Sequence, residues 1–485
     1  SQYTTMESKR QPFLDRARTS CKYTIPTLLL PDDGFSGDAE IKKQFQGLGA
    51  RGVNNLASKL LTSLLPVNSP FFRLQINDYN VKELTQADDQ RAEIEQALNQ
   101  IERAVMVKVE TNGIRVPIFT TLKLLIATGN ALLFVNKEGK IRSYTIENYV
   151  VSRDTFGNVK KIITKDIVNV YNLSEDIRNQ IISEMTEDDL LESEDVELYT
   201  SVVLQEDGSW EITQEIKDIV VEQYITKTNQ YVPLRWTAMV GEDYGRSLVE
   251  EYVGDLKTLE TLTKAIYDTS KLTSQVIFLV NPATQTKVRD LAKAQTGDFV
   301  TGRLGDIETL QINKFNDLSI AQNTILQVEK RLSYAFLLNS SVQRQAERVT
   351  LGEISYMAEE LESALGGVYS VLSQELQLPL VKILMEAMTK GKEIPKLPDN
   401  LIEPTITTGL EALGRGNDLN KLNQFIGIVS QLGPEAMSQR LNIGDYITRV
   451  GASLGIDTQG LIVSDEQIQQ QQQQQMVQQQ IQQEQ

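Results

Sequence analysis

Two amphipathic helices separated by a polar segment dominate the apolar pattern between residues 319 and 379. The first is predicted from apolar residues at steps of four and three, with Asp317 or Ser319 as N-cap and an end near Leu338. Its apolar positions are Ala321, Ile325, Val328, Leu332 and Ala335. The second helix begins at Leu351, is interrupted by Gly366-Gly367, and is expected to kink or end near Pro379. Its apolar positions are Ile354, Met357, Leu361, Leu365, Val368, Leu372 and Leu376.

The segment between these helices, residues 339–350, interrupts the apolar period and is predicted to be a loop. It carries Arg344 and Arg348, whereas the stretch from Leu351 to Leu378 has glutamates and no basic residue. Two interpretations remain open from the spacing. The loop is either the solvated turn of a helical hairpin or a surface presented to a polyanion.

A third long helix is expected earlier in the chain. Its apolar spacing predicts that it begins at Tyr244 and runs for about 32 residues. A small compact unit follows up to Leu318, and the chain then returns through the helix ending near Leu338. Its predicted elements are a strand over 276–280, a short helix over 286–294 and strands near 298–303 and 309–312. Two long amphipathic helices cannot bury their apolar faces against so small a unit, so neighbouring copies of the chain are the expected partners.

The first half of the chain mixes helices with hairpins. Residues 10–30 are expected to be extended because prolines interrupt them, and 53–65 to be a helix. Residues 82–128 predict two or three helices, with breaks near Asn112-Gly113 and Pro117. Three hairpins are predicted: 132–135 with 141–146, 149–153 with 159–163, and 197–205 with 210–216.

The last part of the chain contains a proline-containing linker and then short predicted helices around 409–413, 419–432, 434–441 and 445–454. The tail from residue 467 is rich in glutamine and of low complexity. The expected fold class is α+β and mainly helical.

Composition restricts the chemistry further. The 485 residues carry a net charge of −17, include no histidine and have one cysteine, Cys21. Histidine bases, histidine metal ligands, intramolecular disulfides and multi-thiolate zinc sites are therefore excluded. The acidic balance argues against tight non-specific coating of nucleic acid, which depends on cations that neutralise phosphates. The apolar run from Val116 to Val135 contains Lys123 and Gly129-Asn130, so a buried helix leading into a strand is expected there rather than a membrane span.

No catalytic or cofactor motif is convincing. Residues 47–52 match the letters GxGxxG, but no strand is expected before them, and a phosphate-binding P-loop is absent. Residues 174–197 are strongly acidic, yet without calcium-loop spacing a solvated helix and loop is favoured over a cation site. We expect no catalytic residue, no metal and no cofactor. Since no signal peptide is visible, a soluble intracellular protein is the default expectation.

Five stretches resemble the portal, or head-to-tail connector, of short-tailed double-stranded DNA bacteriophages. They are GARGVNNLASKL (49–60), YVVSRDTFGNV (149–159), AQTGDFVTGR (294–303), LNSSVQR (338–344) and LGGVYSVLSQELQLPL (365–380). The resemblance covers nearly the whole chain in the same order. It implies a portal fold, with twelve copies in a ring around a central DNA channel at one capsid vertex.

The resemblance also implies a division of the chain into named parts. These are a wing (1–243), a first stem helix (244–275), a clip (276–318), a second stem helix (319–338), a channel loop (339–350), a long wing helix with linker (351–404), a helical crown (405–463) and a glutamine-rich tail (464–485). The tail departs from the family pattern and leaves the end of the crown open.

The function implied is that of a connector through which the genome is packaged and ejected, and not that of an enzyme. The implied partners are double-stranded DNA, the terminase motor, tail or adaptor proteins, and capsid and scaffolding proteins, with no stable membrane association. The implied location is the head–tail junction of the virion, and the host cytoplasm during assembly. The alternatives are a non-portal self-assembling scaffold or structural virion protein, which would form open polymers, and a carboxylate-metal nuclease.

Two sets of site residues follow from the resemblance. The channel-loop residues are Asn339, Gln343, Arg344 and Arg348, and the residues of the clip expected to dock partners are Arg289, Lys293, Phe299 and Arg303. An acidic channel wall would repel phosphate, while sparse loop cations would make weak, repeated contacts with DNA. The alternative that Arg344 and Arg348 pair with Glu347 or Glu353 to hold the loop stays open.

Overall fold

The computed structural model describes two compact units. The described residues are 2–30, 41, 43–67, 70–76, 88–184, 195–274, 277–284, 286–310, 315–338, 351–397, 402–406, 422–431, 433, 441, 443–444, 446–447 and 450. Unit 1 comprises residues 1–17, 56–248 and 342–485, and unit 2 comprises residues 18–55 and 249–341. The division falls within two helices, α1 (Gln2–Lys22) and α2 (Leu48–Leu64).

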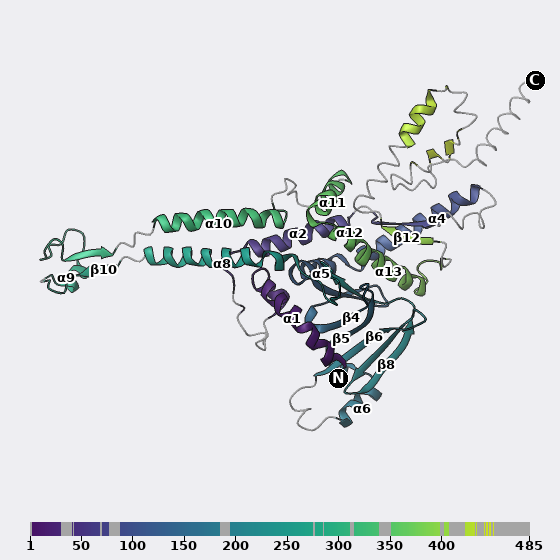
Figure 1. Cartoon of the computed structure of the whole chain (residues 1–485), viewed down its shortest axis with the longest axis horizontal. Coiled ribbons are helices and arrows are strands. Elements are labelled where there is room, and N and C mark those ends of the chain that lie inside the picture. Colours follow the sequence, from purple (N-terminus) through teal and green to yellow (C-terminus); the bar gives the residue numbers. More distant parts are fainter. Residues whose placement is uncertain are drawn as a thin grey trace, which may run out of the picture. The chain divides into compact units, whose positions relative to one another are not determined.

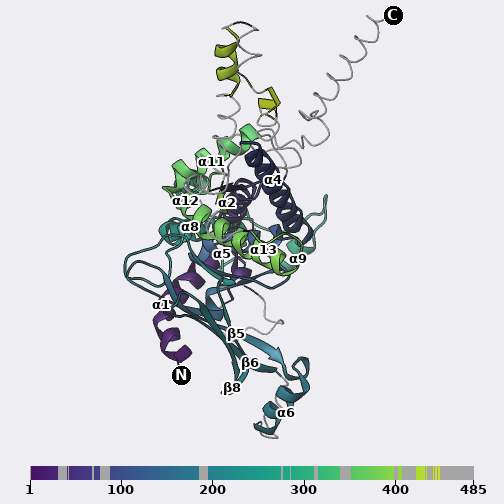
Figure 2. The ribbon, with the colours of Figure 1, turned by 90° about the vertical axis from the view of Figure 1, so that its right-hand side faces the viewer.

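A five-stranded antiparallel meander forms the larger sheet of unit 1 (Figure 2). Its strands are β4 (Tyr149–Arg153), β5 (Val159–Asn169), β6 (Asp195–Leu204), β7 (Trp210–Ile216) and β8 (Ile219–Thr226). The turn between β4 and β5 has Gly157 at φ +86°, and the Asp154 carboxylate accepts the backbone N–H groups of Phe156 and Asn158. This turn chemistry explains why the hairpin was predictable from sequence. Strand β8 follows a two-residue turn at Lys217 and Asp218, both at positive φ, and was not predicted.

The smaller sheet of unit 1 has the order β3-β2-β9. Helix α4 (Asp88–Thr111) ends before Asn112-Gly113 as predicted, but Pro117 lies in the first turn of α5 (Arg115–Thr128) and does not break it. The left-handed Gly129 then leads directly into β2 (Asn130–Val135), which confirms the predicted buried helix-to-strand transition. Strands β3 (Ile141–Tyr144) and β9 (Tyr231–Arg235) both pair antiparallel with β2.

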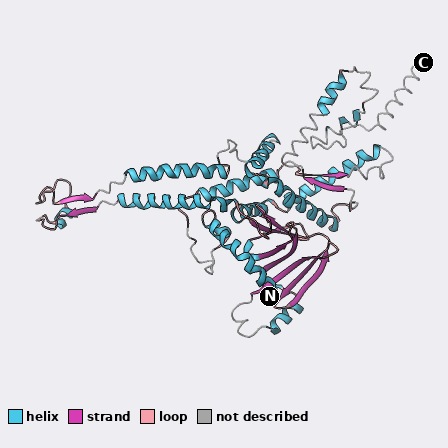
Figure 3. Ribbon diagram, in the orientation of Figure 1, coloured by secondary structure: helices cyan, strands magenta, loops and turns pink. Residues whose placement is uncertain are grey.

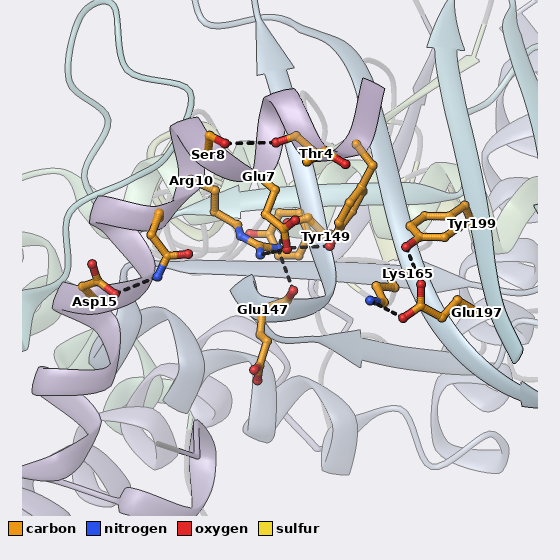
Figure 4. A network of polar contacts seen from close by, with 12 residues as sticks. Thr4, Glu7, Ser8, Arg10, Asp15, Glu147, Tyr149, Lys165, Glu197 and Tyr199 are labelled. Carbon is orange, nitrogen blue, oxygen red and sulfur yellow. Dashed lines mark hydrogen bonds and ion pairs between the residues drawn. The ribbon is translucent and has the colours of Figure 1, made fainter. Parts of the chain in front are cut away.

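Helix α1 corrects the prediction that residues 10–30 are extended, since it runs to Lys22 with Pro12 inside it. In unit 1, its Arg10 is buried and donates hydrogen bonds to the carbonyls of Glu147 and Tyr149 at 2.6 and 3.1 Å (Figure 4). Tyr3 packs edge-on against Tyr199, with ring centroids 5.1 Å apart. These tertiary contacts hold the helix against the sheet despite its weak amphipathic pattern.

The second helical region of unit 1 is broken where two glycines were expected to interrupt it. Gly366 and Gly367 have φ of +59° and +88°, and they separate α11 (Leu351–Leu365) from α12 (Val368–Leu372). A π-helical turn (Ser373–Gln377) leads into α13 (Leu378–Lys390). Pro379 does not end the helix, because it stands in the first turn of α13, where no helical N–H is needed.

Unit 1 also contains a short strand pair that the sequence did not predict. Strand β1 (Phe72–Ile76) pairs antiparallel with β12 (Ile402–Ile406), so part of the expected linker is a strand that includes Pro404. A two-stranded sheet leaves every strand with a free edge, which is where proline is tolerated. Of the short helices predicted after residue 405, residues 422–430 of the one at 419–432 are helical, as are 446–447 and 450 of the one at 445–454. Residues 409–413 and 434–440 lie outside the described residues.

Unit 2 contains the antiparallel pair α8 (Leu248–Thr273) and α10 (Phe315–Ala335), which lie side by side (Figure 1). Helix α8 begins four residues after Tyr244. The residues between are held in other contacts: Arg246 forms an isolated antiparallel β-bridge with Thr237, and the Gly245 N–H donates to the Asn130 side chain. Helix α10 begins at Phe315, so neither Asp317 nor Ser319 is its N-cap. Asp317 instead lies in the first turn, where a carboxylate favours the helix dipole.

A small unit joins α8 to α10 and consists of β10 (Ile277–Val280), α9 (Val288–Lys293) and β11 (Ile307–Leu310), as Figure 3 shows. The two strands pair antiparallel, with Ile277 opposite Leu310. The first strand and the short helix were predicted. The strand predicted at 298–303 is wrong, since these residues form a loop.

Candidate functional site

The α8–α10 pair has a well-packed root near the start of α8 and the end of α10. Leu256 and Leu259 of α8 are buried there, as are Val328, Leu332 and Phe336 of α10. The carboxylate of Asp255 pairs with the guanidinium of Arg331 at 2.7 Å. Before α2, the backbone N–H groups of Phe45 and Gln46 donate to the Glu260 carboxylate at 3.0 to 3.1 Å. Side chains of α8 and α10, together with the backbone just before α2, therefore fix the root.

The far half of the same helix pair buries nothing. None of residues 260–273 of α8 and none of residues 317–327 of α10 is buried. The large apolar side chains left exposed there are Tyr267, Leu272, Ile320 and Leu326, each more than half exposed. An amphipathic helix that keeps its apolar face in water normally has a partner for that face.

The small β10–α9–β11 segment between the two helices also lacks an apolar core among its described residues. Thr286 is the one buried residue among the described residues of 277–310. Its hydroxyl donates to the Asp306 carboxylate at 2.7 Å and accepts the Arg303 N–H at 3.2 Å. Hydrogen bonds from the Thr284 and Thr286 hydroxyls lower the pKa of Asp306 below its ordinary value. The Thr286 hydroxyl thus ties Arg303, the last residue of the predicted strand, to Asp306 within a loop.

The four clip residues predicted to dock partners all lie on this small unit. Arg289 and Lys293 are exposed on α9, and Phe299 and Arg303 are exposed on the loop that follows. Within the described part of the chain, the side chains of Arg289 and Lys293 form no hydrogen bond or ion pair. Phe299 is fully exposed, at 105%. The structure therefore gathers cations and a bare aromatic ring on one segment.

The predicted channel-loop residues, Asn339, Gln343, Arg344 and Arg348, lie outside the described residues. The structure describes the segment that precedes them: α10 ends at Ala335 and is followed by a turn through Leu338. Sequence reasoning missed Gly52 and Asn55 of α2, which contact this end of α10. An isolated glycine inside a helical pattern was the available signal, since it often marks a close packing contact.

The acidic stretch 174–197 is described in part. Residues 175–184 form helix α6 (Glu175–Glu184), whose Ile181 packs against Val196 and Ile216 of the sheet and against Val170, which directly follows β5. No group of three acidic, histidine or cysteine side chains suited to a metal ion occurs in the described ranges. In those ranges, likewise, no helix combines the length and apolar content needed to cross a bilayer.

The sequence profile of the bacteriophage head to tail connecting protein family matches residues 1–462. The chain belongs to this family, and it is a head-to-tail connector.

Three curated relatives give the more particular likeness. The chain is similar to the portal protein of Escherichia phage T7, with 42% identity over 480 residues, 97% of this chain and 89% of the relative. The portal protein of Enterobacteria phage T3 is 43% identical over 476 residues, covering 96% and 88%. That of Enterobacteria phage SP6 is 31% identical over 468 residues, covering 95% and 89%. The resemblance to portals of short-tailed phages is thereby confirmed.

Proposed function

We propose that this connector forms a closed ring of identical subunits around a channel for double-stranded DNA at one capsid vertex. The observation that supports the proposal is the apolar sheet of unit 2. Ile277, Phe278 and Leu279 are consecutive on β10 and all exposed, at 43%, 61% and 51%. Because successive side chains of a strand point to opposite faces, both faces of the two-stranded sheet are apolar. A ring gives each subunit two neighbours through a heterologous interface, which covers both faces.

The roles of the chain segments follow the family likeness. We assign residues 1–243 to a wing, 244–275 and 319–338 to the two stem helices, 276–318 to a clip, 339–350 to a channel loop, 351–404 to the long wing helix with its linker, 405–463 to a crown and 464–485 to a tail. The helices α8 and α10 correspond to the proposed stem. Their exposed far halves support a position between neighbouring subunits.

The proposed partners are those of a genome conduit. DNA passes through the ring during packaging and ejection, and the clip binds the terminase motor first and tail or adaptor proteins afterwards. Capsid and scaffolding proteins surround the ring at the head–tail junction, and assembly takes place in the host cytoplasm. The exposed Arg289, Lys293, Phe299 and Arg303 support docking at the clip, because aromatic residues and arginine are enriched at protein interfaces.

The first experiment is native mass measurement of the purified chain together with negative-stain imaging. Twelve chains of 54.5 kDa would give a ring of about 650 kDa with a central hole. An open filament would favour the alternative, a self-assembling scaffold. A chain that stays monomeric at every concentration would contradict assembly through the exposed apolar faces. Phe278→Ser should reduce the ring fraction, while Val240→Ser, at a fully exposed site of unit 1, should not.

The DNA contact is proposed for Arg344 and Arg348. In a chain with a net charge of −17, these sparse cations would bind phosphate weakly and repeatedly. Arg344→Ala with Arg348→Ala should leave the ring mass unchanged and alter DNA packaging or retention. Lys137→Ala with Lys140→Ala, at two exposed positions of one hairpin, is the matched loss of two cations. Normal packaging and retention in the double variant would disprove the assignment and favour pairing with Glu347 or Glu353.

A further inference from the structure

Helix α10 ends in a left-handed turn that is unfavourable for its own sequence. The Leu338 N–H donates to the Ser333 carbonyl at 2.8 Å, and the Leu337 N–H donates to the Tyr334 carbonyl at 3.2 Å. These bonds define a helix C-terminus that is usually completed by glycine in the left-handed position. Here that position is Leu337, with φ of +54°. A leucine side chain disfavours this conformation, so the turn needs support from elsewhere.

The support comes from α2. The Asn55 side-chain amide donates to the carbonyls of Phe336 and Leu337 at 3.1 and 3.2 Å. Both carbonyls lie past the last helical residue, where no intrahelical donor serves them. Asn55 therefore acts as a C-cap supplied by a neighbouring helix.

Close packing completes the support one helical turn earlier on α2. A Cβ added to Gly52 would lie 2.5 Å from two ring atoms of Phe336, which is closer than real side chains approach. Phe336 is fully buried. Gly52 and Asn55 are three residues apart and so share one face of α2. The neighbouring Asn54 is exposed, and its side-chain amide donates to the Ala50 carbonyl of its own helix.

We propose that Gly52 and Asn55 are positioning residues for the segment 339–350: they hold the strained end of α10 and thereby set where that segment leaves the helix. The inference rests on the proposed function, in which the segment carries the DNA contact. The capping of α10 by Asn55 does not depend on that function, because the strained turn and its cap lie wholly within described residues of unit 2. The segment begins one residue after Leu338, so a frayed helix end displaces its starting point.

The test compares four full-length variants in the assembled protein. They are Asn55→Ala, the matched control Asn54→Ala, Leu337→Gly, and Asn55→Ala combined with Leu337→Gly. Hydrogen exchange of the amides of residues 336–338 should become about tenfold faster in Asn55→Ala and stay unchanged in Asn54→Ala. Leu337→Gly should restore slow exchange to Asn55→Ala, since glycine removes the strain that Asn55 offsets.

DNA retention is the second readout and should follow the same order. Asn55→Ala should retain less DNA at unchanged ring mass, and adding Leu337→Gly should restore retention. Wild-type exchange rates in Asn55→Ala would overturn the inference whatever Arg344→Ala with Arg348→Ala does to DNA. Faster exchange with unchanged DNA retention would also overturn it, because the cap would then be structural only. If the arginine variant retains DNA normally, the proposed DNA contact is wrong. The hydrogen-exchange result still shows whether Asn55 caps the end of α10.

Discussion

The two ends of the α8–α10 pair differ in whether their apolar side chains are buried within the chain. At the root, Leu256, Leu332 and Phe336 are buried within one chain. At the far end, Leu272, Ile320 and residues 277–279 of β10 remain exposed. Both ends come from helices with the same amphipathic period. The difference teaches that the apolar side chains of the pair are buried within the subunit where α2 packs against it. The exposed side chains of the far end are the ones that the proposed ring would cover.

The largest expected difference is between two leucines of α10. Leu332→Ala should lower the free energy of unfolding by about 2–5 kcal/mol, because it opens a cavity in the root. Leu326→Ala, at a side chain that is more than half exposed, should leave it nearly unchanged and instead weaken ring assembly. Urea unfolding of dissociated subunits and native mass analysis measure the two effects. Equal losses of stability would show that the two ends do not differ in this way.

A smaller effect is expected from two glycines within helices. Gly52→Ala should destabilise by about 1–3 kcal/mol, because the added methyl group meets the buried Phe336 ring. Gly254→Ala should stabilise by about 0.5–1 kcal/mol, because no atom lies near its new Cβ and alanine favours the helix. Thermal unfolding midpoints would measure both. A stabilising Gly52→Ala would mean that the root is packed less tightly than these distances indicate.

The smallest effect is local to the far end and depends on pH. The folded loop lowers the pKa of Asp306, so its contribution to loop stability is present above the ordinary carboxyl pKa and is lost as pH falls through the lowered value. A fluorophore on Thr301→Cys should therefore keep constant anisotropy from pH 7 to about 4 and lose anisotropy below that. Cys21 does not compete for the label, because it is buried and burial raises the pKa of its thiol to about 12.

The same label distinguishes Asp306 from other carboxylates. Asp306→Asn should show the lower anisotropy already at neutral pH, since the amide binds the two threonine hydroxyls less well. Glu308→Gln, at an exposed position of β11, should titrate like the parent protein. An Asp306→Asn protein with unchanged anisotropy at pH 7 would exclude the carboxylate as the holder of the loop.

Turn chemistry and apolar period determined much of the fold from the sequence alone. The three hairpins, the break at Asn112-Gly113 and the interruption at Gly366-Gly367 are local, because glycine, asparagine and aspartate act on their own backbone. The family likeness named the connector. Helices α8, α10 and α11 were found from their apolar period, although the first residues of α8 and α10 were misplaced.

Tertiary structure decided the elements whose local signals were weak or contrary. Helix α1 contains Pro12 yet forms because Arg10 and Tyr3 bind the sheet, and β12 contains Pro404 yet pairs with β1. Residues 298–303 have a strand-like sequence, but they form a loop, and the Thr286 hydroxyl accepts the backbone N–H of Arg303 at its end. The end of α10 depends on Asn55, which lies 281 residues from Phe336 in sequence. Such contacts cannot be predicted from a periodic pattern, because their free energy arises only when distant segments are brought together.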